Sequence, residues 1–166
     1  APVAVAAATT AAAPSAKPRV LVADEEESSR GLMESIARRL GHDVEAVVDG
    51  AQAIPAFEEH GASVILMDIN MPVADGRVAT QRIRAIEAAR GTPEDARVPI
   101  IALCGDALPG DEEEYRALGM NDLLPKPFRL DELRGMLDRW LEKRPRGARA
   151  AAEAPAVAPA AAAPAP

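Results

Sequence analysis

Short apolar runs alternate with amphipathic stretches over most of the chain. The runs are rich in Val, Ile and Leu, as in the buried strands of a parallel sheet, and the stretches between them have the spacing of helices. Strands are predicted at 19–23, 43–48, 63–67, 98–103 and 122–124. Because strands and helices alternate, the pattern predicts a single doubly wound α/β domain, with one parallel sheet covered by helices on both faces.

The first predicted helix is bounded by typical start and stop residues. Ser28 or Ser29 is expected to cap its N-terminus, and Gly41 is expected to end it. Leu32 and Ile36 lie on the apolar stripe of this helix, so we expect both side chains to face the core.

Prolines shape the prediction of the later helices. The segment 51–60 has helical spacing but contains Pro55. An interior proline costs about 3 kcal/mol, so we expect this helix to be kinked or to begin late. Pro109 is expected in the first turn of a helix, where a missing N–H does no harm. Further helices are predicted at 77–90 and 130–142.

The two ends of the chain differ in composition from the middle. Residues 1–17 and 145–166 are mostly Ala and Pro, the composition of linkers, so a single folded domain is predicted at 18–144. A linker on each side suggests a domain taken from a longer protein. With aromatic residues at only 2 %, the core is expected to be aliphatic.

Charge and cysteine content limit the classes of partner and compartment. A net charge of −7 argues against a general affinity for nucleic acid or for anionic membranes. Cys104 is the only cysteine, which excludes an internal disulfide and fits a reducing compartment. No run approaches the roughly 18 apolar residues of a membrane span. We therefore expect a cytoplasmic domain without nucleic-acid or direct membrane contacts.

Chemically active side chains follow four of the predicted strands. Asp24 and Glu25 come after the first strand, and Asp68 comes after the third. The fourth strand leads to Cys104 and the fifth to Lys126. Because parallel sheets bind ligands outside the carboxyl ends of their strands, we expect the three carboxylates and the lysine to meet there. Such carboxylates would raise one another's pKa unless a cation neutralises them, and their hard oxygens suit Mg²⁺.

Each of these residues also has a simpler interpretation when taken alone. Asp24 could cap a helix, Lys126 could be a solvated lysine, and Cys104 could be a small side chain that fills the core. Four groups placed by four separate strands are hard to obtain by chance. The Lys126–Pro127 bond could in addition be cis, which would turn the lysine back over the pocket.

Three segments resemble the receiver domain of response regulators and, above all, that of hybrid sensor histidine kinases. They are VLVADEEE at 20–27, VILMDINMPVADG at 64–76 and IIALCGDALPGDEEEYRALGMNDLLPKPF at 100–128. The resemblance spans roughly residues 19–143. It implies a flavodoxin-like fold, in which a sheet of five parallel strands is flanked by five helices. It also implies a phosphoacceptor aspartate at the end of the third strand.

The resemblance implies roles for individual residues. Asp68 would be the phosphoacceptor, and Lys126 would pair with it or with its phosphate. Mg²⁺ would be held by Asp24, Glu25, Asp68 and the backbone carbonyl of Asn70. The carboxylate of Asp68 would take a phosphoryl group from a phosphohistidine, carried by a histidine kinase or a histidine phosphotransfer domain. Such a domain catalyses only its own phosphorylation and dephosphorylation.

Three positions depart from the family pattern. Glu25 stands where Asp is usual, and its extra methylene moves a metal ligand outward. Cys104 replaces a Ser or Thr that senses the phosphoryl group, and a thiol is a weaker donor. Leu123 stands where many members have a Tyr or Phe that swings inward. We therefore expect Asp68 to accept phosphate while the usual conformational response is muted.

Two further expectations concern the surroundings of the acceptor. The helix after the first strand, with Met33, Ala37 and Arg38, is expected to dock a helical histidine phosphotransfer partner. Asp106 could orient a hydrolytic water together with Asn70, although helix capping is its simpler role.

Two other functions remain open at the level of sequence. A pseudo-receiver would bind partners without phosphorylation, and both Glu25 and Cys104 favour this alternative because they weaken the site. A phosphatase of the haloacid dehalogenase type would also form an aspartyl phosphate, but it needs a second Asp at the position of Asn70. The domain itself could belong to a hybrid histidine kinase or stand alone.

Overall fold

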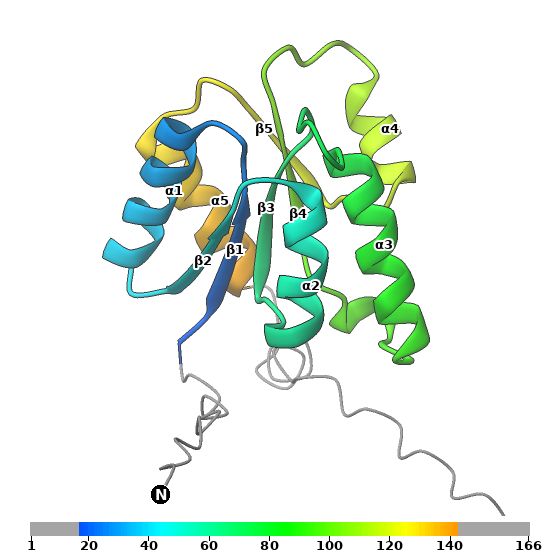
Figure 1. Cartoon of the computed structure of the whole chain (residues 1–166). Helices are drawn as coiled ribbons and strands as arrows, with labels where there is room; N and C mark the ends of the chain where they lie inside the picture. Colours follow the sequence, from blue (N-terminus) through cyan, green and yellow to red (C-terminus); the bar gives the residue numbers. More distant parts are fainter. Residues whose placement is uncertain (1–16, 143–166) are drawn as a thin grey trace, which may run out of the picture.

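A computed structural model describes residues 17–142 of the chain (Figure 1). The sheet has five parallel strands in the order β2-β1-β3-β4-β5, which confirms the predicted fold class. The strands are β1 (Arg19–Ala23), β2 (Asp43–Val47), β3 (Val64–Asp68), β4 (Ile100–Cys104) and β5 (Asp122–Pro125). The predicted tails, apart from Lys17, lie outside the described residues.

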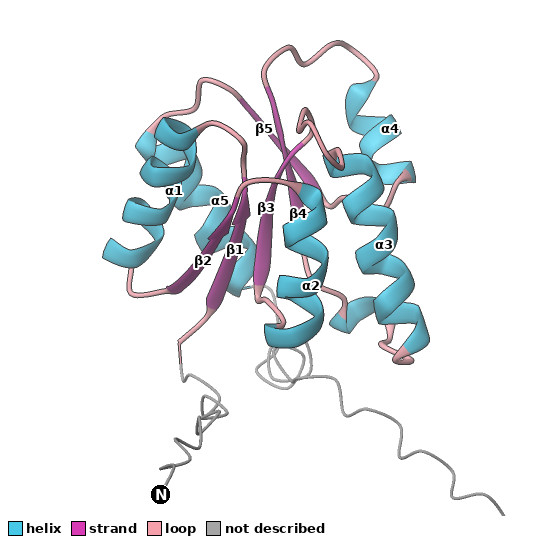
Figure 2. Cartoon of the chain, viewed as in Figure 1, coloured by secondary structure: helices cyan, strands magenta, loops and turns pink. Residues whose placement is uncertain are grey.

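Helices cover both faces of the sheet, as Figure 2 shows. They are α1 (Glu27–Arg39), α2 (Gly50–His60), α3 (Gly76–Ala89), α4 (Asp111–Ala117) and α5 (Leu130–Glu142), with a short 3₁₀ turn, η1 (Glu94–Ala96), before β4. Side chains of α1 and α5 pack in the core layer on one face, and side chains of α2, α3 and α4 pack in the layer on the other. None of the helices between residues 17 and 142 is long and apolar enough to cross a membrane.

Alternation along the strands builds the two core layers. In β1, Val20 and Val22 belong to the layer under α1 and α5, whereas Leu21 and Ala23 belong to the layer under α2, α3 and α4. Every residue of β3 is buried, because this strand has neighbours on both sides and helices over both faces. The core is aliphatic as expected, with Phe57 the largest of its fully buried side chains.

Helix α1 corrects two predictions. It begins at Glu27, before Ser28 and Ser29, and its N-cap Glu26 makes no side-chain capping bond. An acidic first turn is favoured by the helix dipole, so the helix extends back through the acidic run. Leu32 is 51 % exposed and does not face the core.

The buried positions of α1 follow a tighter spacing than the predicted stripe. They are Met33, Ile36 and Ala37, which lie at i, i+3 and i+4. This spacing keeps side chains on one face of a helix of 3.6 residues per turn better than repeated steps of four. Ile36 therefore faces the core as predicted, while the remainder of the buried face is shifted by one residue.

Helix α2 does not begin late. It starts at Gly50, where the Asp49 side chain accepts a hydrogen bond from the backbone N–H of Gln52 at 2.8 Å. Pro55 lies inside the helix, and Phe57 is among the buried residues beside it. The cap and the burial of the helix face compensate for the backbone hydrogen bond that the proline lacks.

Helix α4 begins later than predicted. Its N-cap is Gly110, at a positive φ of 101° that favours glycine, so Pro109 precedes the helix. Asp106 is exposed and lies before this cap, so it does not cap α4. The carboxylate of Asp111 instead accepts a hydrogen bond from the backbone N–H of Leu108 at 2.7 Å, which closes the turn before the helix.

Candidate functional site

The carboxyl ends of the strands form the upper edge of the sheet in Figure 1. Asp24 directly follows β1, Asp68 is the last residue of β3, and Cys104 is the last residue of β4. The parallel register places Ala23 level with Met67, so the two aspartates leave neighbouring strands at the same height. The edge therefore holds the predicted groups close to one another.

One lysine bridges two buried carboxylates at this edge. The Nζ of Lys126 lies 2.7 Å from Oδ2 of Asp24 and 3.2 Å from Oδ2 of Asp68. Both aspartates are almost inaccessible to solvent, with exposures of 0 % and 6 %. The Lys126–Pro127 bond is cis, as the sequence allowed. The structure thus brings together three of the predicted site residues from three separate strand ends.

Backbone groups hold the second oxygen of each carboxylate. Oδ1 of Asp24 accepts a hydrogen bond from the N–H of Glu26 at 2.9 Å, and Oδ1 of Asp68 accepts one from the N–H of Asn70 at 3.1 Å. Each aspartate is therefore fixed at one oxygen by its own loop and at the other by Lys126. Such preorganisation leaves the carboxylates little freedom to reorient.

Gly76 also shapes the site beside Asp68. A Cβ at this position would lie 2.3 Å from the backbone oxygen of Asp68, so only glycine allows the start of α3 to approach so closely. The N–H of Gly76 donates to the carbonyl of Ile69 at 3.0 Å, which closes the loop after β3. The loop that follows Asp68 is therefore held at both ends.

Burial and charge shift the pKa of two site groups. Desolvation raises the pKa of Asp68, and the nearby charge of Lys126 only partly opposes this shift. Burial alone would lower the pKa of Lys126, but its hydrogen bond to Asp24 and the charges of both carboxylates raise that pKa above its ordinary value. Ionisation of Asp68 is therefore less favourable than that of a free aspartate, whereas Lys126 holds its proton more strongly than a free lysine.

The donor set suits a hard divalent cation, but it is only partly assembled. Two carboxylates and one ammonium leave one negative charge in excess, and carboxylate oxygens are preferred ligands of Mg²⁺. Among residues 17–142, no three side chains of Asp, Glu, His or Cys lie together in a way that could hold a metal ion. Glu25 is exposed, so the expected convergence of three carboxylates is wrong. Desolvating a third carboxylate beside a single lysine is unfavourable, which explains why Glu25 stays in solvent.

Sequence reasoning missed Arg30, which secures the loop after β1. Its Nη1 donates to the backbone carbonyl of Asp24 at 2.9 Å and to that of Glu25 at 3.3 Å. Its place near the start of α1, among both basic and acidic residues, gave no sign of this contact. Arg30 therefore holds the acidic pair through the backbone carbonyls of both residues.

Sequence reasoning also missed Tyr115, which lies beside Cys104. The Cys104 side chain is 4 % exposed, and its Sγ lies 3.6 Å from the hydroxyl of Tyr115 on α4. Burial raises the pKa of Tyr115 to about 12, and the contact with Cys104 acts in the same direction. The signal available in the sequence was a lone aromatic residue in the charged helix DEEEYRA. Leu123 is partly buried and packs against the same core layer.

The predicted docking residues on α1 are mostly in the core. Met33 and Ala37 have no exposed surface, so they cannot form a docking face, and this prediction is wrong. Arg38 is exposed and forms an ion pair with Glu34 at 2.6 Å. The apolar side chain that α1 does present to solvent is that of Leu32.

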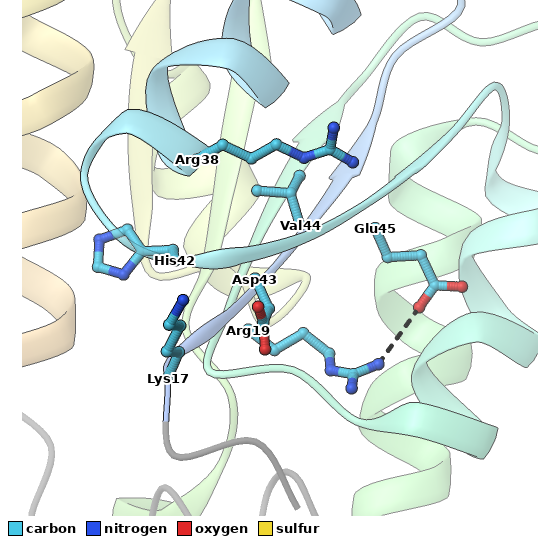
Figure 3. Close-up of a pocket in the computed structure, with 7 residues that line it drawn as sticks. All are labelled: Lys17, Arg19, Arg38, His42, Asp43, Val44 and Glu45. Carbon is cyan, nitrogen blue, oxygen red and sulfur yellow. Dashed lines mark ion pairs between the residues drawn. The ribbon is translucent and has the colours of Figure 1, made fainter. Parts of the chain in front are cut away.

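A separate pocket of about 450 Å³ lies at the opposite edge of the sheet (Figure 3). It is lined by Lys17, Arg19, Arg38, His42, Asp43, Val44 and Glu45. Arg19 and Asp43 are the first residues of β1 and β2, so this pocket lies at the amino ends of the strands. Within this pocket, Arg19 forms an ion pair with Glu45 at 3.8 Å. Because the predicted site residues lie at the carboxyl ends of the strands, the candidate functional site is the carboxyl edge.

Comparison with known proteins identifies relatives by sequence. The family model of the response regulator receiver domain matches residues 20–138. Transcription factor SKN7 from Saccharomyces cerevisiae is 37 % identical over 75 % of this chain, and sensor protein GacS from Pseudomonas syringae is 34 % identical over 74 % of it. The matches cover 19 % and 13 % of these two proteins, so the chain spans less than a fifth of their length.

Solved structures share the fold. The receiver domain of sensor histidine kinase PA1611 from Pseudomonas aeruginosa, solved with a magnesium ion coordinated in its active site cleft, is 42 % identical with a TM-score of 0.66; the match covers 76 % of this chain and 99 % of that one. The complex of the histidine phosphotransfer protein Ypd1 with the receiver domain of Ssk1, from Saccharomyces cerevisiae, gives 26 % identity and a TM-score of 0.69, covering 76 % and 91 %.

Proposed function

This chain belongs to the response regulator receiver domain family, and on that premise we propose that Asp68 takes a phosphoryl group from a phosphohistidine. The observation that carries the proposal is the buried carboxylate of Asp68, held by Lys126 Nζ at 3.2 Å and by the N–H of Asn70 at 3.1 Å. A buried carboxylate at a strand end, beside a fixed cation, is suited to attack an electrophilic phosphorus.

The reaction would be an in-line displacement. An oxygen of Asp68 forms a bond to phosphorus while the bond from phosphorus to the histidine nitrogen breaks, and that nitrogen keeps the electron pair. Lys126 lies within reach to balance the charge on the transferred oxygens. Because little covalent chemistry is asked of the protein, positioning and electrostatics supply most of the catalysis. The acyl phosphate would later be hydrolysed or passed to another histidine.

Mg²⁺ is proposed as the second source of positive charge. The residues that would hold it are Asp24, Asp68, Glu25 and the backbone carbonyl of Asn70. The excess negative charge of the two buried carboxylates supports this assignment. When bound, the ion would neutralise charge on the phosphoryl oxygens. Glu25 would join the ligand set only after its side chain leaves solvent, so we expect weaker metal binding than an Asp at this position would give.

The partner is proposed to be a histidine kinase or a histidine phosphotransfer domain in the cytoplasm. The complex of Ypd1 with the Ssk1 receiver supports a histidine phosphotransfer protein as a partner. Leu32 on α1, which is half exposed, replaces Met33 and Ala37 as the apolar contact on that side. Similarity to GacS supports a hybrid histidine kinase as the parent chain, with the receiver at 18–144 between two linkers.

The alternative is a pseudo-receiver, which the exposed Glu25 favours. The dehalogenase-type phosphatase is not proposed, because Asn70 occupies the position where that chemistry needs an acid. Incubation of the chain with Mg²⁺ and acetyl phosphate, followed by intact mass spectrometry, separates the first two functions. A gain of one phosphoryl group that is absent in Asp68→Asn supports the receiver. No gain at any Mg²⁺ concentration favours the pseudo-receiver.

A further inference from the structure

The loop between β1 and α1 carries three acids in a row, Asp24, Glu25 and Glu26. The first is fixed, because its carboxylate contacts Lys126 Nζ at 2.7 Å and the N–H of Glu26 at 2.9 Å. The third is turned toward the start of α1, where its Oε1 accepts a hydrogen bond from the Ser28 hydroxyl at 2.9 Å. Glu25, which is exposed, is therefore the acid of this loop with the freedom to join the two buried aspartates.

The backbone on both sides of Glu25 is held by a side chain from α1. Nη1 of Arg30 donates to the carbonyl of Asp24 at 2.9 Å and to the carbonyl of Glu25 at 3.3 Å. These two carbonyls belong to the planar peptide units that precede and follow the Cα of Glu25. One guanidinium nitrogen therefore fixes both peptide planes, and with them the direction in which the Glu25 side chain leaves the backbone.

The two ends of this loop are held by backbone hydrogen bonds instead. The N–H of Asp24 donates to the carbonyl of Val47 at 3.2 Å, and the carbonyl of Glu26 accepts from the N–H of Arg30 at 2.9 Å. The Arg30 side chain thus holds the middle of the loop. Without it, Glu25 would regain backbone freedom that has to be lost again when its side chain binds a ligand. Fixing the backbone of one residue corresponds to a factor on the order of ten in an equilibrium constant.

The charge and the hydrogen bonds of Arg30 act on a bound cation in opposite directions. Its guanidinium is always charged and repels Mg²⁺, whereas the two hydrogen bonds favour Mg²⁺ by fixing the loop. The side chain is only half-buried, so water and salt screen its charge. We therefore expect the positioning effect to be the larger of the two.

We propose that Arg30 is a positioning residue, which holds Glu25 in the orientation from which its carboxylate joins Asp24 and Asp68 around Mg²⁺. The inference rests on the proposed function of Asp68 and on Mg²⁺ as the cation of that site. It assigns a part in metal binding to a side chain that supplies no ligand atom. Loss of Arg30 therefore weakens Mg²⁺ binding although every proposed ligand is still present.

The test is calorimetric titration of the complete chain with Mg²⁺. Arg30→Gln shortens the side chain and removes its charge, and we expect it to bind Mg²⁺ about tenfold more weakly than wild type. Arg39→Gln removes the same charge at an exposed position in the last turn of α1, so it is the matched control, with an affinity within about twofold of wild type. Arg30→Lys keeps a charged donor and should lie between wild type and Arg30→Gln.

A second arm separates positioning from general support of the fold. In the Glu25→Ala background the positioned ligand is gone, so Arg30→Gln should change the affinity for Mg²⁺ by less than about twofold. Urea unfolding in chelator checks that each variant is folded, and Arg30→Lys takes the place of Arg30→Gln if the latter does not fold. An equal loss in both backgrounds, or tighter binding in Arg30→Gln than in wild type, would overturn the inference.

The same samples distinguish failure of the inference from failure of the proposed function. If wild type neither binds Mg²⁺ nor gains a phosphoryl group from acetyl phosphate, both proposals are wrong. If wild type gains the group and Arg30→Gln binds Mg²⁺ as tightly as wild type, only the inference is wrong.

Discussion

The two sides of the carboxyl edge are built by different forces. On one side, Lys126 joins two buried aspartates at 2.7 and 3.2 Å, across sequence separations of 102 and 58 residues. On the other side, Cys104 and Tyr115 meet at 3.6 Å across a separation of 11 residues. The first contact is between full charges, whereas the second is a weak hydrogen bond that involves sulfur.

This difference predicts that the two sides of the edge can be altered independently of each other. The charged side, made by Lys126, Asp24 and Asp68, requires the whole sheet to be folded before its groups meet, so it is fixed by the fold. The sulfur side, made by Cys104 and Tyr115, joins one strand end to a short helix and can be altered without disturbing the sheet. The predictions below are directed at this contrast, from the largest expected effect to the smallest.

Removal of Lys126 should produce the largest effect. Lys126→Ala leaves two buried carboxylates without their cation, so we expect a loss of about 3 kcal/mol in the free energy of unfolding with a metal chelator present. Urea unfolding at neutral pH measures it, with Arg129→Ala, at an exposed neighbour, as the control. A loss in the free energy of unfolding no larger than that of Arg129→Ala would contradict the claim that Lys126 stabilises the two buried aspartates.

The pH dependence of that loss follows from the raised pKa of Lys126. The contribution of the lysine is fully present below its ordinary pKa of 10.5 and declines as the pH rises through the higher value of the folded state. The difference in the free energy of unfolding between wild type and Lys126→Ala should therefore stay constant from neutral pH to the ordinary lysine pKa and become smaller above it.

Neutralising Asp68 should stabilise the metal-free domain. Burial raises the pKa of Asp68, so its ionisation costs stability as the pH rises through the folded value. Asp68→Asn is expected to gain about 1 kcal/mol at neutral pH in chelator, and the gain should shrink as the pH falls toward the ordinary aspartate value of 3.8. Thermal unfolding at several pH values measures it. A lower melting temperature for Asp68→Asn at neutral pH would contradict the assigned shift.

Shortening the Glu25 side chain should strengthen Mg²⁺ binding at the charged side. Glu25→Asp brings the third carboxylate nearer the strand end, and we expect Mg²⁺ to bind roughly threefold more tightly, since this ion tolerates little misplacement of its ligands. Calorimetric titration with Mg²⁺ measures the change, and Glu26→Asp, one residue farther along, is the matched control. Equal affinities in wild type and Glu25→Asp would mean that position 25 is not a metal ligand.

Removal of the Tyr115 hydroxyl should have the smallest effect on stability. Tyr115→Phe keeps the ring in the core and loses one weak hydrogen bond, so we expect a loss of about 0.5 kcal/mol. Urea unfolding measures this loss, and the same measurement on Lys126→Ala allows the two sides of the edge to be compared directly. A loss as large as that of Lys126→Ala would show that the two sides do not differ in strength.

The sequence predicted the charged side because much of its geometry follows from topology. Once the strands are parallel, the ends that carry Asp24, Asp68 and Lys126 share an edge, and the long lysine side chain reaches past β4 from β5 to the two aspartates. The prediction that Glu25 joins the two aspartates was wrong, because the position of a residue in the chain does not show what it costs to desolvate a third carboxylate. The prediction that Met33 and Ala37 form a docking face was wrong because the buried face of α1 is shifted by one residue from the predicted stripe.

The sulfur side was harder to predict because it depends on where a short helix packs. Tyr115 is the lone aromatic residue in a helix of charged residues, which indicates that it turns inward but not which group it meets there. The start of α4 was also misplaced, because Pro109 fits a first turn equally well by its own chemistry. Only the packing of α4 against β4 and β5 brings the hydroxyl to Cys104.

Phosphoryl transfer from a phosphohistidine tests the central claim most directly. The chain is mixed with a phosphorylated histidine phosphotransfer protein and Mg²⁺, and its intact mass is followed with time, beside Asp68→Asn and Tyr115→Phe. We predict that wild type and Tyr115→Phe each gain one phosphoryl group while Asp68→Asn gains none. No gain in wild type, or an equal gain in Asp68→Asn, would contradict the claim that Asp68 accepts the group.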